Sequence, residues 1–347
     1  MKKYLILLLI FTSHAYSFEY PYNTLDKSFI TTPNTEILVP NLTPIKAQDG
    51  VGVCYGFTAT TLLEHYRCRE LNLDCSKPSE VLSSLDVTSY YGEKKNSLKQ
   101  GGTVFSSLTR ISAKTTTIAR EECIPFNSMV HQMQNVRGTK KNEEVGWRYL
   151  ELKWQEYKGI NKAANDCVTC LATDIKKNIA GIKTPAEQIS EAFSTSSDLE
   201  EFLYKSILPK ECLEKDKAAF MPPFTPKSFP DLNREQTAIE DISEAILVKK
   251  VTDLLSAQTP VEMGICADKK WSPDCEDNEG HSITLVGIKE ACGKTPKECR
   301  KMVLVRNSYG KNWQDRTNGG WIDLEEVVKS SLALTKFRNI TWIEKAK

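Results

Sequence analysis

The most informative residue of the chain is Cys54, which ends a glycine-containing loop and begins a stretch with helical spacing. His281 and Asn307 follow far downstream, each beside a short apolar segment. A thiol, an imidazole and a side-chain amide, in this order along a chain, are the parts of a cysteine-nucleophile hydrolase. In that chemistry the sulfur attacks a carbonyl carbon, an acyl-enzyme forms, and water then hydrolyses it.

The thiol of Cys54 must lose its proton before it can attack. A free cysteine is only a few per cent ionised at neutral pH. A helix N-terminus favours a negative charge by about 0.3–1 kcal/mol, and an imidazolium partner supplies most of the rest as an ion pair. We therefore expect a Cys54 thiolate paired with a histidine.

The chain has four histidines, and only one of them suits this role. His14 lies in an N-terminal segment that we expect to be removed. His65 lies on the same predicted helix as the thiol, roughly 16 Å away along the axis, which is beyond hydrogen-bond reach. His131 lies in a charged block without a strand to hold it. His281 opens an apolar strand that can aim its ring, and it is our candidate acid and base.

Two further side chains complete the candidate site. Asn307 ends a predicted strand next to that of His281, where its carbonyl can orient the imidazole without adding a charge. Gln48 precedes Cys54 across a Gly-containing turn, so its NH2 group can join the backbone N–H of Cys54 at the developing oxyanion. The predicted catalytic residues are thus Cys54, His281, Asn307 and Gln48.

The elements that must position these residues differ between the two ends of the chain. Apolar residues at positions 55, 59, 62, 63 and 66 predict an amphipathic helix that begins at Cys54. Further helices are expected near 78–80 and 105–111, and another at 242–256. Short strands are expected at 261–266, 282–288, 302–306 and 320–324. A helical first third and a β-rich last third indicate an α+β protein with two lobes.

The block between them, residues 127–235, is charged and helix-prone. Trp147, Leu150 and Trp154 lie on one face of a helix expected at 143–157, and 221–226 is expected to be an extended, proline-rich connector. We interpret the block as an inserted helical subdomain. The predicted organisation is a signal peptide at 1–17, an arm and helical lobe at 18–126, the insertion at 127–235, and a β-rich lobe at 236–347.

The first residues have the pattern of a secretory signal peptide. Lys2 and Lys3 precede an apolar run from Tyr4 to Phe11, and small residues follow at 15 and 17. No later segment has 18 apolar residues in a row, so we expect a secreted or periplasmic protein without a membrane anchor after cleavage. The formal net charge of +1 and the lack of a long basic run argue against nucleic acid as a partner.

Eleven cysteines in an exported chain favour disulfides and leave one thiol over, which we assign to Cys54. Short spacing predicts the bridges Cys68–Cys75, Cys266–Cys275 and Cys292–Cys299. The four cysteines that remain allow three connectivities, among which the sequence does not choose; they are Cys123, Cys167, Cys170 and Cys212.

A metal or redox role for Cys167 and Cys170 has little support. Their spacing gives half of a zinc site, but neither a second such pair nor a histidine pair with ligand spacing accompanies it. No strand–turn–helix pattern precedes the pair, as a redox motif would need. We expect no metal and no cofactor.

Taken together, these residues resemble the papain family of cysteine proteases. Residues 48–57 resemble the family's nucleophile segment, 280–281 its histidine region, and 307–313 its asparagine segment, within matching stretches at about 40–126 and 240–325. The resemblance implies a papain-like two-lobed fold with a helical insertion. It also implies that Cys54 is the nucleophile, His281 the acid and base, Asn307 the orienting group and Gln48 the oxyanion donor.

The chain departs from the family pattern in several places. Tyr55 and Tyr309 stand where the family prefers tryptophan, and Val51 and Lys99 stand where it has a pair of half-cystines. The interval between the thiol and His281 exceeds the family's roughly 130–150 residues, and the insertion accounts for the excess.

The resulting prediction is a secreted papain-like cysteine endopeptidase that acts on peptide or protein substrates. A protein inhibitor in trans, or the insertion itself, is a candidate for controlling activity. Two alternatives stay open. One is a catalytically silent binding protein on the same scaffold; the other is a non-proteolytic acyl or amide transferase, a class in which the third catalytic residue is usually aspartate rather than Asn307.

Overall fold

A computed structural model describes most of the chain. The described residues are 29–49, 51–91, 98, 101–140, 145–159, 166–179, 181–220, 223–231, 242–266, 280–293, 295, 298–334, 336 and 338–346, without the side chains of 166 and 167. The predicted signal peptide, Gly50, Lys99 and Cys275 lie outside these residues.

The helical lobe is built around α1 (Cys54–Leu71), whose side chains are buried along almost its whole length. The predicted helix therefore exists and is longer than its apolar pattern. The 3₁₀ helix η1 (Pro78–Glu80), α2 (Ser84–Ser89) and α4 (Val104–Lys114) pack around it. Ser83 and Thr103 cap α2 and α4 by accepting hydrogen bonds from backbone N–H groups of the first turn, which fixes where both helices begin.

Between the helical lobe and the sheet the chain makes a long helical excursion. It leaves through β3 (Thr117–Ala119) and returns through β4 (Lys217–Ala219), which pairs antiparallel with β3. The Cys123–Cys212 disulfide joins the same two ends of the excursion. Its helices are α5 (Phe126–Met133), α6 (Val145–Gly159), α7 (Asp166–Asn178), α8 (Ala186–Thr195), α9 (Leu199–Ile207) and α10 (Lys210–Lys215).

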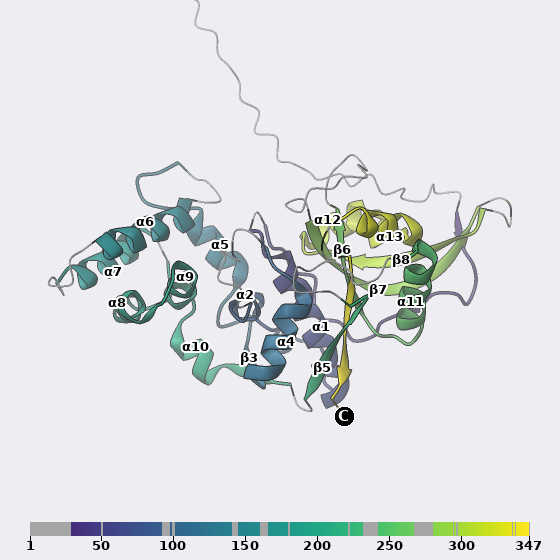
Figure 1. Cartoon of the computed structure of the whole chain (residues 1–347), viewed down its shortest axis with the longest axis horizontal. Coiled ribbons are helices and arrows are strands. Elements are labelled where there is room, and N and C mark those ends of the chain that lie inside the picture. The colour runs from purple at the N-terminus through teal and green to yellow at the C-terminus, as the bar shows by residue number, and fades with distance from the viewer. Residues whose placement is uncertain are drawn as a thin grey trace, which may run out of the picture.

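The excursion shares one apolar core with the helical lobe. Trp147, Leu150 and Trp154 of α6 are buried, as their spacing predicted, and Trp154 stacks on Phe193 and Phe202. The same continuous cluster includes the buried face of α1. In Figure 1, α6 to α9 lie on the left, the sheet lies on the right, and α1 and α4 lie between them.

The β-rich lobe contains a sheet in the order β5-β10-β6-β7-β8-β9, with two short strands added along β7. Every pairing in it is antiparallel. The strands are β1 (Ile30–Thr31), β2 (Ile37–Leu38), β5 (Phe224–Phe229), β6 (Val261–Cys266), β7 (Gly280–Cys292), β8 (Arg300–Arg306), β9 (Trp321–Asp323) and β10 (Ile340–Lys345).

The four predicted strands all exist, whereas β5 and β10 were not predicted. The expected connector at 221–226 overlaps β5, which pairs with β10 along the edge of the sheet. Pro226 fits there because an edge strand leaves one side of its backbone without a ladder partner. The N-terminal arm likewise contributes β1 and β2, which were not predicted.

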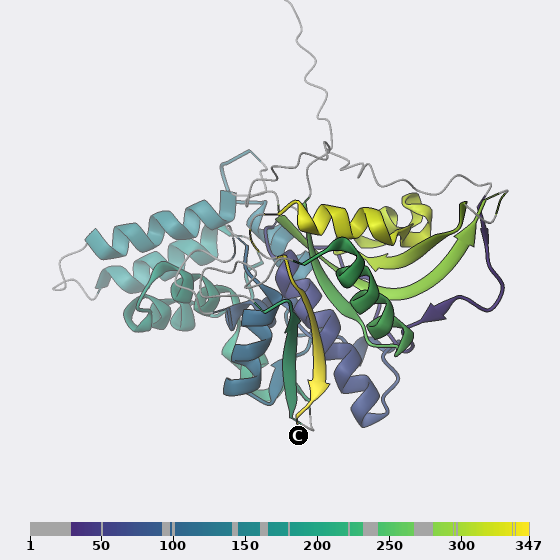
Figure 2. The same cartoon turned by 45° about the vertical axis from the view of Figure 1, so that its right-hand side comes forward.

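Helices cover both faces of this sheet. α11 (Glu244–Ser256) and α13 (Leu324–Leu332) pack on one face, and α1 packs on the other, against β6, β7 and β10 (Figure 2). The short α12 (Gly310–Arg316) and the 3₁₀ helix η4 (Asn318–Gly320) follow β8. A second apolar cluster fills the space between the sheet and its outer helices. The expected α+β fold with a helical lobe and a β-rich lobe is therefore confirmed.

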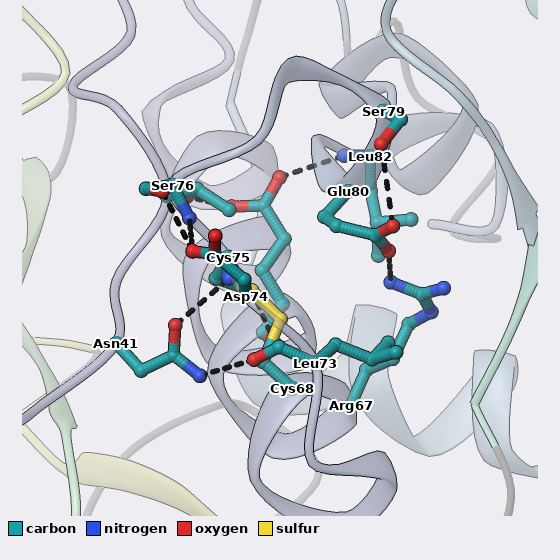
Figure 3. The surroundings of a disulfide bond; sticks show 12 residues. Asn41, Arg67, Cys68, Leu73, Asp74, Cys75, Ser76, Ser79, Glu80 and Leu82 are labelled. Atoms are coloured by element: carbon teal, nitrogen blue, oxygen red, sulfur yellow. Dashed lines mark hydrogen bonds and ion pairs between the residues drawn. A yellow bond between two sulfur atoms is a disulfide. The ribbon is translucent and has the colours of Figure 1, made fainter.

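Disulfides secure several loops. Cys68–Cys75 and Cys292–Cys299 form as predicted. Cys266 is also disulfide-bonded, but its expected partner lies outside the described residues. Figure 3 shows Asn41 beside the first of these bridges, where its amide accepts from the backbone N–H of Cys75 and donates to the carbonyl of Leu73. No helix in the described part of the chain is both long and apolar enough to cross a bilayer.

Candidate active site

Cys54 is the first residue of α1, and its half-buried thiol is in no disulfide. The backbone N–H groups of Cys54 and Tyr55 in the first turn lower the pKa of the thiol. The positive end of the helix macrodipole is therefore directed at the sulfur. This is the position that the sequence predicted for a nucleophile.

The start of β7 lies against this first turn of α1. The hydroxyl of Thr58, one turn along α1 from Cys54, donates to the carbonyl of Ser282 at 3.2 Å, and the backbone N–H of Ser282 is close enough to the thiol to lower its pKa. Because Ser282 directly follows His281, the predicted histidine lies on the segment that packs against the first turns of α1. The helical excursion does not separate the segments of Cys54 and His281, because it starts at β3 and ends at β4, which pair side by side.

His281 is buried, and both of its ring nitrogens have neighbours. Nε2 lies 2.8 Å from Oδ1 of Asn307, and Nδ1 lies 3.5 Å from the hydroxyl of Tyr309. The rings of His281 and Tyr309 stack with centroids 4.7 Å apart and planes 9° apart. An amide oxygen can only accept, so Nε2 carries the proton of the neutral ring and Nδ1 is the acceptor nitrogen.

Asn307 follows the last residue of β8 and is 2% exposed. Its Oδ1 is engaged with His281, whereas its Nδ2 has no hydrogen-bond partner among the described residues. The segment around it is held by the N-terminal arm: the guanidinium of Arg306 donates to the carbonyls of Thr43 and Pro44. The segment that carries Asn307 is thus anchored to the N-terminal arm.

Gln48 belongs to the same arm and is also buried. Its Nε2 donates to the carbonyl of Val51 at 2.9 Å, and its Oε1 accepts from the hydroxyl of Ser308. The backbone N–H of Gln48 donates to the carbonyl of Ser308 at 2.7 Å. These bonds leave one of the two Nε2 hydrogens for a further acceptor. Gln48 is therefore held between the nucleophile loop and the residue after Asn307.

Burial favours the neutral forms of the thiol and the imidazole. It raises the pKa of the Cys54 thiol, against the stabilising effect of the three backbone N–H groups, and the nearby carboxyl of Glu262 raises that pKa further. It also lowers the pKa of His281 to about 4, although the bond to Asn307 acts in the opposite direction. Burial alone therefore acts against the ion pair expected from the sequence.

Glu262 is a site residue that the sequence analysis missed. It lies on β6 between Thr284 of β7 and Thr341 of β10, and it accepts a hydrogen bond from the hydroxyl of Ser282 at 3.2 Å. Its side chain is buried, and burial raises its pKa to about 7. An isolated glutamate inside the otherwise apolar strand Val261–Cys266 is the signal that would have revealed it.

The other described histidines do not contribute to this site. His65 is buried on α1, where burial and then the charge of Arg69 lower its pKa to about 4. His131 is exposed on α5, in the excursion. His65 thus lies on the helix of Cys54 and His131 in the excursion, as the sequence predicted.

A cluster of potential metal ligands among the described residues is formed by Glu290, Cys292 and Cys299. The two cysteines are bonded to each other, so neither sulfur is a thiolate that could bind a metal. The expectation of no metal and no cofactor stays a prediction.

The sequence matches no protein-family model, and no curated protein resembles it at a significant level. Solved structures do resemble it. One is bromelain protease from Ananas comosus in complex with the E64 inhibitor, with 14% identity, a TM-score of 0.43, and coverage of 90% of this chain and 99% of that one. Another is SERA5E from Plasmodium falciparum, with 12% identity, a TM-score of 0.45, and coverage of 93% and 98%. Similarity at this level carries no conclusion about activity.

Proposed function

We propose that this chain is a secreted papain-like cysteine endopeptidase that hydrolyses peptide bonds through Cys54 and His281. The observation that carries the proposal is the arrangement at the end of α1. An unpaired thiol receives backbone N–H groups from its own helix and from the residue after His281. The imidazole is in turn held at its other nitrogen by Asn307. Nucleophile, base and orienting group are the three parts that covalent hydrolysis requires.

In the proposed acylation step, Nδ1 of His281 takes the proton of the Cys54 thiol while the sulfur electron pair forms a C–S bond with the substrate carbonyl carbon. The carbonyl π electrons move to the oxygen, where the backbone N–H of Cys54 and the remaining N–H of Gln48 are the proposed donors. When the C–N bond breaks, the imidazolium gives its proton to the leaving amine.

Deacylation repeats these transfers with water. His281 takes a proton from water as the water oxygen forms a C–O bond, the C–S bond breaks, and the proton returns to the sulfur. Because burial favours the neutral form of both groups, the thiolate and the imidazolium form together, and each stabilises the charge of the other in a site of low dielectric constant.

Labelling by a thiol-directed epoxide, combined with cleavage of a peptide library, tests this proposal. We expect labelling at Cys54 and cleavage of internal peptide bonds, with both lost in Cys54→Ala. Cys170→Ala is a matched control, because Cys170 is an exposed cysteine on α7. Cleavage that survives in Cys54→Ala would place the nucleophile elsewhere.

A catalytically silent binding protein is the second candidate, and one observation favours it. The hydroxyl of Tyr309 lies near Nδ1 of His281, the nitrogen that must take the thiol proton, and burial disfavours charge on both reacting groups. If Nδ1 of His281 could not take the thiol proton, the wild-type thiol would react with the epoxide no faster than a small-molecule thiol, and no peptide would be cleaved.

Export is part of the proposal. The bonded cysteines of the described residues suit an oxidising compartment. We expect the protein to be recovered outside the cytoplasm with residues 1–17 removed, as N-terminal sequencing of the mature chain would show. A cytoplasmic chain that still begins at Met1 would contradict this part.

A further inference from the structure

A groove separates the helical lobe from the helical excursion, away from the thiol. Its volume is about 470 Å³, within the range of ordinary ligand sites. One wall comes from the end of α2 and from α4, and the other comes from α9 and α10 (Figure 1). Because the excursion forms a whole wall, the groove exists only in a chain that carries it.

Two cations in this groove have no partner among the residues that the structure describes. Arg110 and Lys114 lie one turn apart on α4 and line the wall of the helical lobe. Neither makes a hydrogen bond or an ion pair with any residue that the structure describes, and Arg110 is nevertheless half-buried. A partly buried guanidinium without an anion forgoes charge-assisted hydrogen bonds that a carboxylate would supply.

The acidic residues of the opposite wall are already engaged. Asp198 caps α9 by accepting from the backbone N–H of Glu201 at 2.9 Å. Glu201 pairs with Lys205 at 2.7 Å and accepts from the backbone N–H of Ser197, which together with other contacts lowers its pKa to about 2. The remaining acid, Glu200, has an interaction within the chain, although its buried Oε2 has no hydrogen-bond partner among the described residues. The lining holds three acids and three cations, so its formal charge is balanced, and what distinguishes Arg110 and Lys114 is that neither has a partner among the described residues.

The groove also has apolar walls that lead toward the candidate active site. Tyr91, Tyr204 and Leu208 line it and are nearly buried. The ring of Tyr91 lies 5.0 Å from that of Tyr55, the residue after Cys54. A single aromatic contact in the core thus connects the wall of the groove with the first turn of α1.

We propose that this groove binds an acidic segment of the polypeptide substrate, remote from the bond that is cleaved, with its carboxylates on Arg110 and Lys114. The proposal rests on the proposed peptidase function and adds a substrate class to it. Binding of this kind stabilises the bound substrate and the transition state alike, so it lowers KM and leaves kcat almost unchanged. It weakens as salt rises, because Lys114 is exposed.

Two fluorogenic peptides test this substrate preference in the full-length protein. They share the residues around the cleaved bond, and one of them carries an extension rich in aspartate and glutamate. We expect the wild type to prefer the acidic peptide by about tenfold in kcat/KM, as two partly exposed charge-assisted contacts would give. In R110E/K114E the ratio of the two kcat/KM values should fall to one or below.

The control variant R148E/K177E makes the same change in net charge on α6 and α7, at exposed cations outside the groove. It should keep the wild-type ratio. A wild type without preference, an equal loss in both variants, or a preference expressed only in kcat would overturn the proposal.

A binding measurement separates failure of this proposal from failure of the proposed function. In the Cys54→Ala background, fluorescence anisotropy should show that the acidic peptide binds about tenfold more tightly than the plain one at low salt, and that R110E/K114E removes the difference. If the wild type cleaves nothing but this difference is found, the groove is a binding site and the peptidase assignment fails. If binding shows no difference, the groove proposal fails whatever the catalytic result.

Discussion

The candidate active site and the groove beside the excursion are opposite kinds of environment. At the active site, Gln48, Glu262, His281 and Asn307 are buried and tied to neighbouring elements by hydrogen bonds. In the groove, Arg110 and Lys114 are only partly covered and have no partner among the described residues. Chemistry needs groups that are already in place before the substrate arrives, whereas recognition of a charged segment needs charges that are not yet neutralised.

The active site and the groove differ because different elements build them. Two lobes meet at the active site: α1 brings the thiol, β7 and β8 bring the imidazole and the amide, and the arm at residues 43–48 contacts both lobes. The groove has a rigid wall on α4 and a second wall on helices that come from an excursion joined at β3 and β4. The comparison therefore predicts severe effects for single changes at the first region and graded, salt-dependent effects at the second.

Replacement of His281 by alanine gives the largest expected effect after loss of the nucleophile itself. Without the imidazole the thiol has no base, and burial keeps its proton in place. We expect kcat/KM to fall by about 10²–10⁴-fold, the usual contribution of a positioned acid and base. Peptide cleavage measures this, and alkylation of Cys54 by iodoacetamide at pH 7 should slow as well.

His65→Ala is the matched control, since His65 is equally buried but makes no contact with the thiol. Its alkylation rate at Cys54 should stay near that of the wild type, provided that circular dichroism shows a folded chain. Equal slowing in both variants would mean that general destabilisation, rather than loss of the base, explains the result.

Replacement of Gln48 by alanine separates chemistry from activation of the thiol. Its amide is placed to bind the oxyanion, which exists only after attack, so we expect a loss in kcat of about 10²–10³-fold. Alkylation of Cys54 forms no oxyanion, and its rate should change little. The contrast with His281→Ala, which affects both readouts, is the measurement that matters. A Gln48→Ala variant whose alkylation falls as far as its kcat would show that Gln48 only supports the fold of the loop.

Removal of the Cys123–Cys212 bridge tests how far the two regions are coupled. The bridge closes a loop of 89 residues, so the chain-entropy model predicts a loss of roughly 4–5 kcal/mol in the free energy of unfolding as an upper value. Because the excursion and the helical lobe share one apolar core, they should still unfold in a single transition at a lower temperature. Calorimetry of C123S/C212S measures this.

The matched control is C292S/C299S, which opens a bridge with a sequence separation of only 7. The same model predicts a loss smaller by about 2 kcal/mol. Two separate transitions in C123S/C212S, with the lower one confined to the excursion, would show that the groove wall is an independent unit rather than part of the lobe that carries Cys54.

The elements near the active site were predictable because local patterns determine them. The helix from Cys54 and the strand 261–266 follow from the spacing and run of their apolar residues, and both agree closely with α1 and β6. Elimination among the histidines also needed no structure, since distance along one helix excludes His65. The roles of Asn307 and Gln48 were predicted from their positions after a strand and before a Gly-containing turn, and the resemblance to a known family implied the same roles.

What could not be predicted depends on contacts between distant parts of the chain. The first half of β5, with Pro226, was interpreted as a connector, because its partner among the described strands, β10, lies more than a hundred residues away. The partner of Cys123 was open for the same reason. The neutral state of the Cys54 and His281 pair follows from burial at the meeting of two lobes, and the sequence carries no measure of that burial.

The smallest expected effect on reactivity belongs to Glu262→Gln, a change in the buried active site. The carboxyl of Glu262 has its pKa raised from 4.5 to about 7, so the folded chain keeps a proton that the unfolded chain loses between these values. Wild-type stability should therefore fall as pH rises through this window, by at most about 3 kcal/mol in total. Glutamine has no proton to lose, and urea unfolding at several pH values should show no such fall.

The same substitution changes the thiol only where Glu262 is charged. Above pH 7 the ionised carboxylate of Glu262 disfavours the Cys54 thiolate. Cys54 should therefore be alkylated several-fold faster in Glu262→Gln than in the wild type above pH 7, and at the same rate below pH 5. In the groove, by contrast, R110E should leave this pH profile unchanged, because Arg110 is not among the groups that shift the pKa of the thiol. If R110E moved the profile as far as Glu262→Gln does, the two regions would be electrostatically linked, and the separation of buried chemistry from open recognition would not hold.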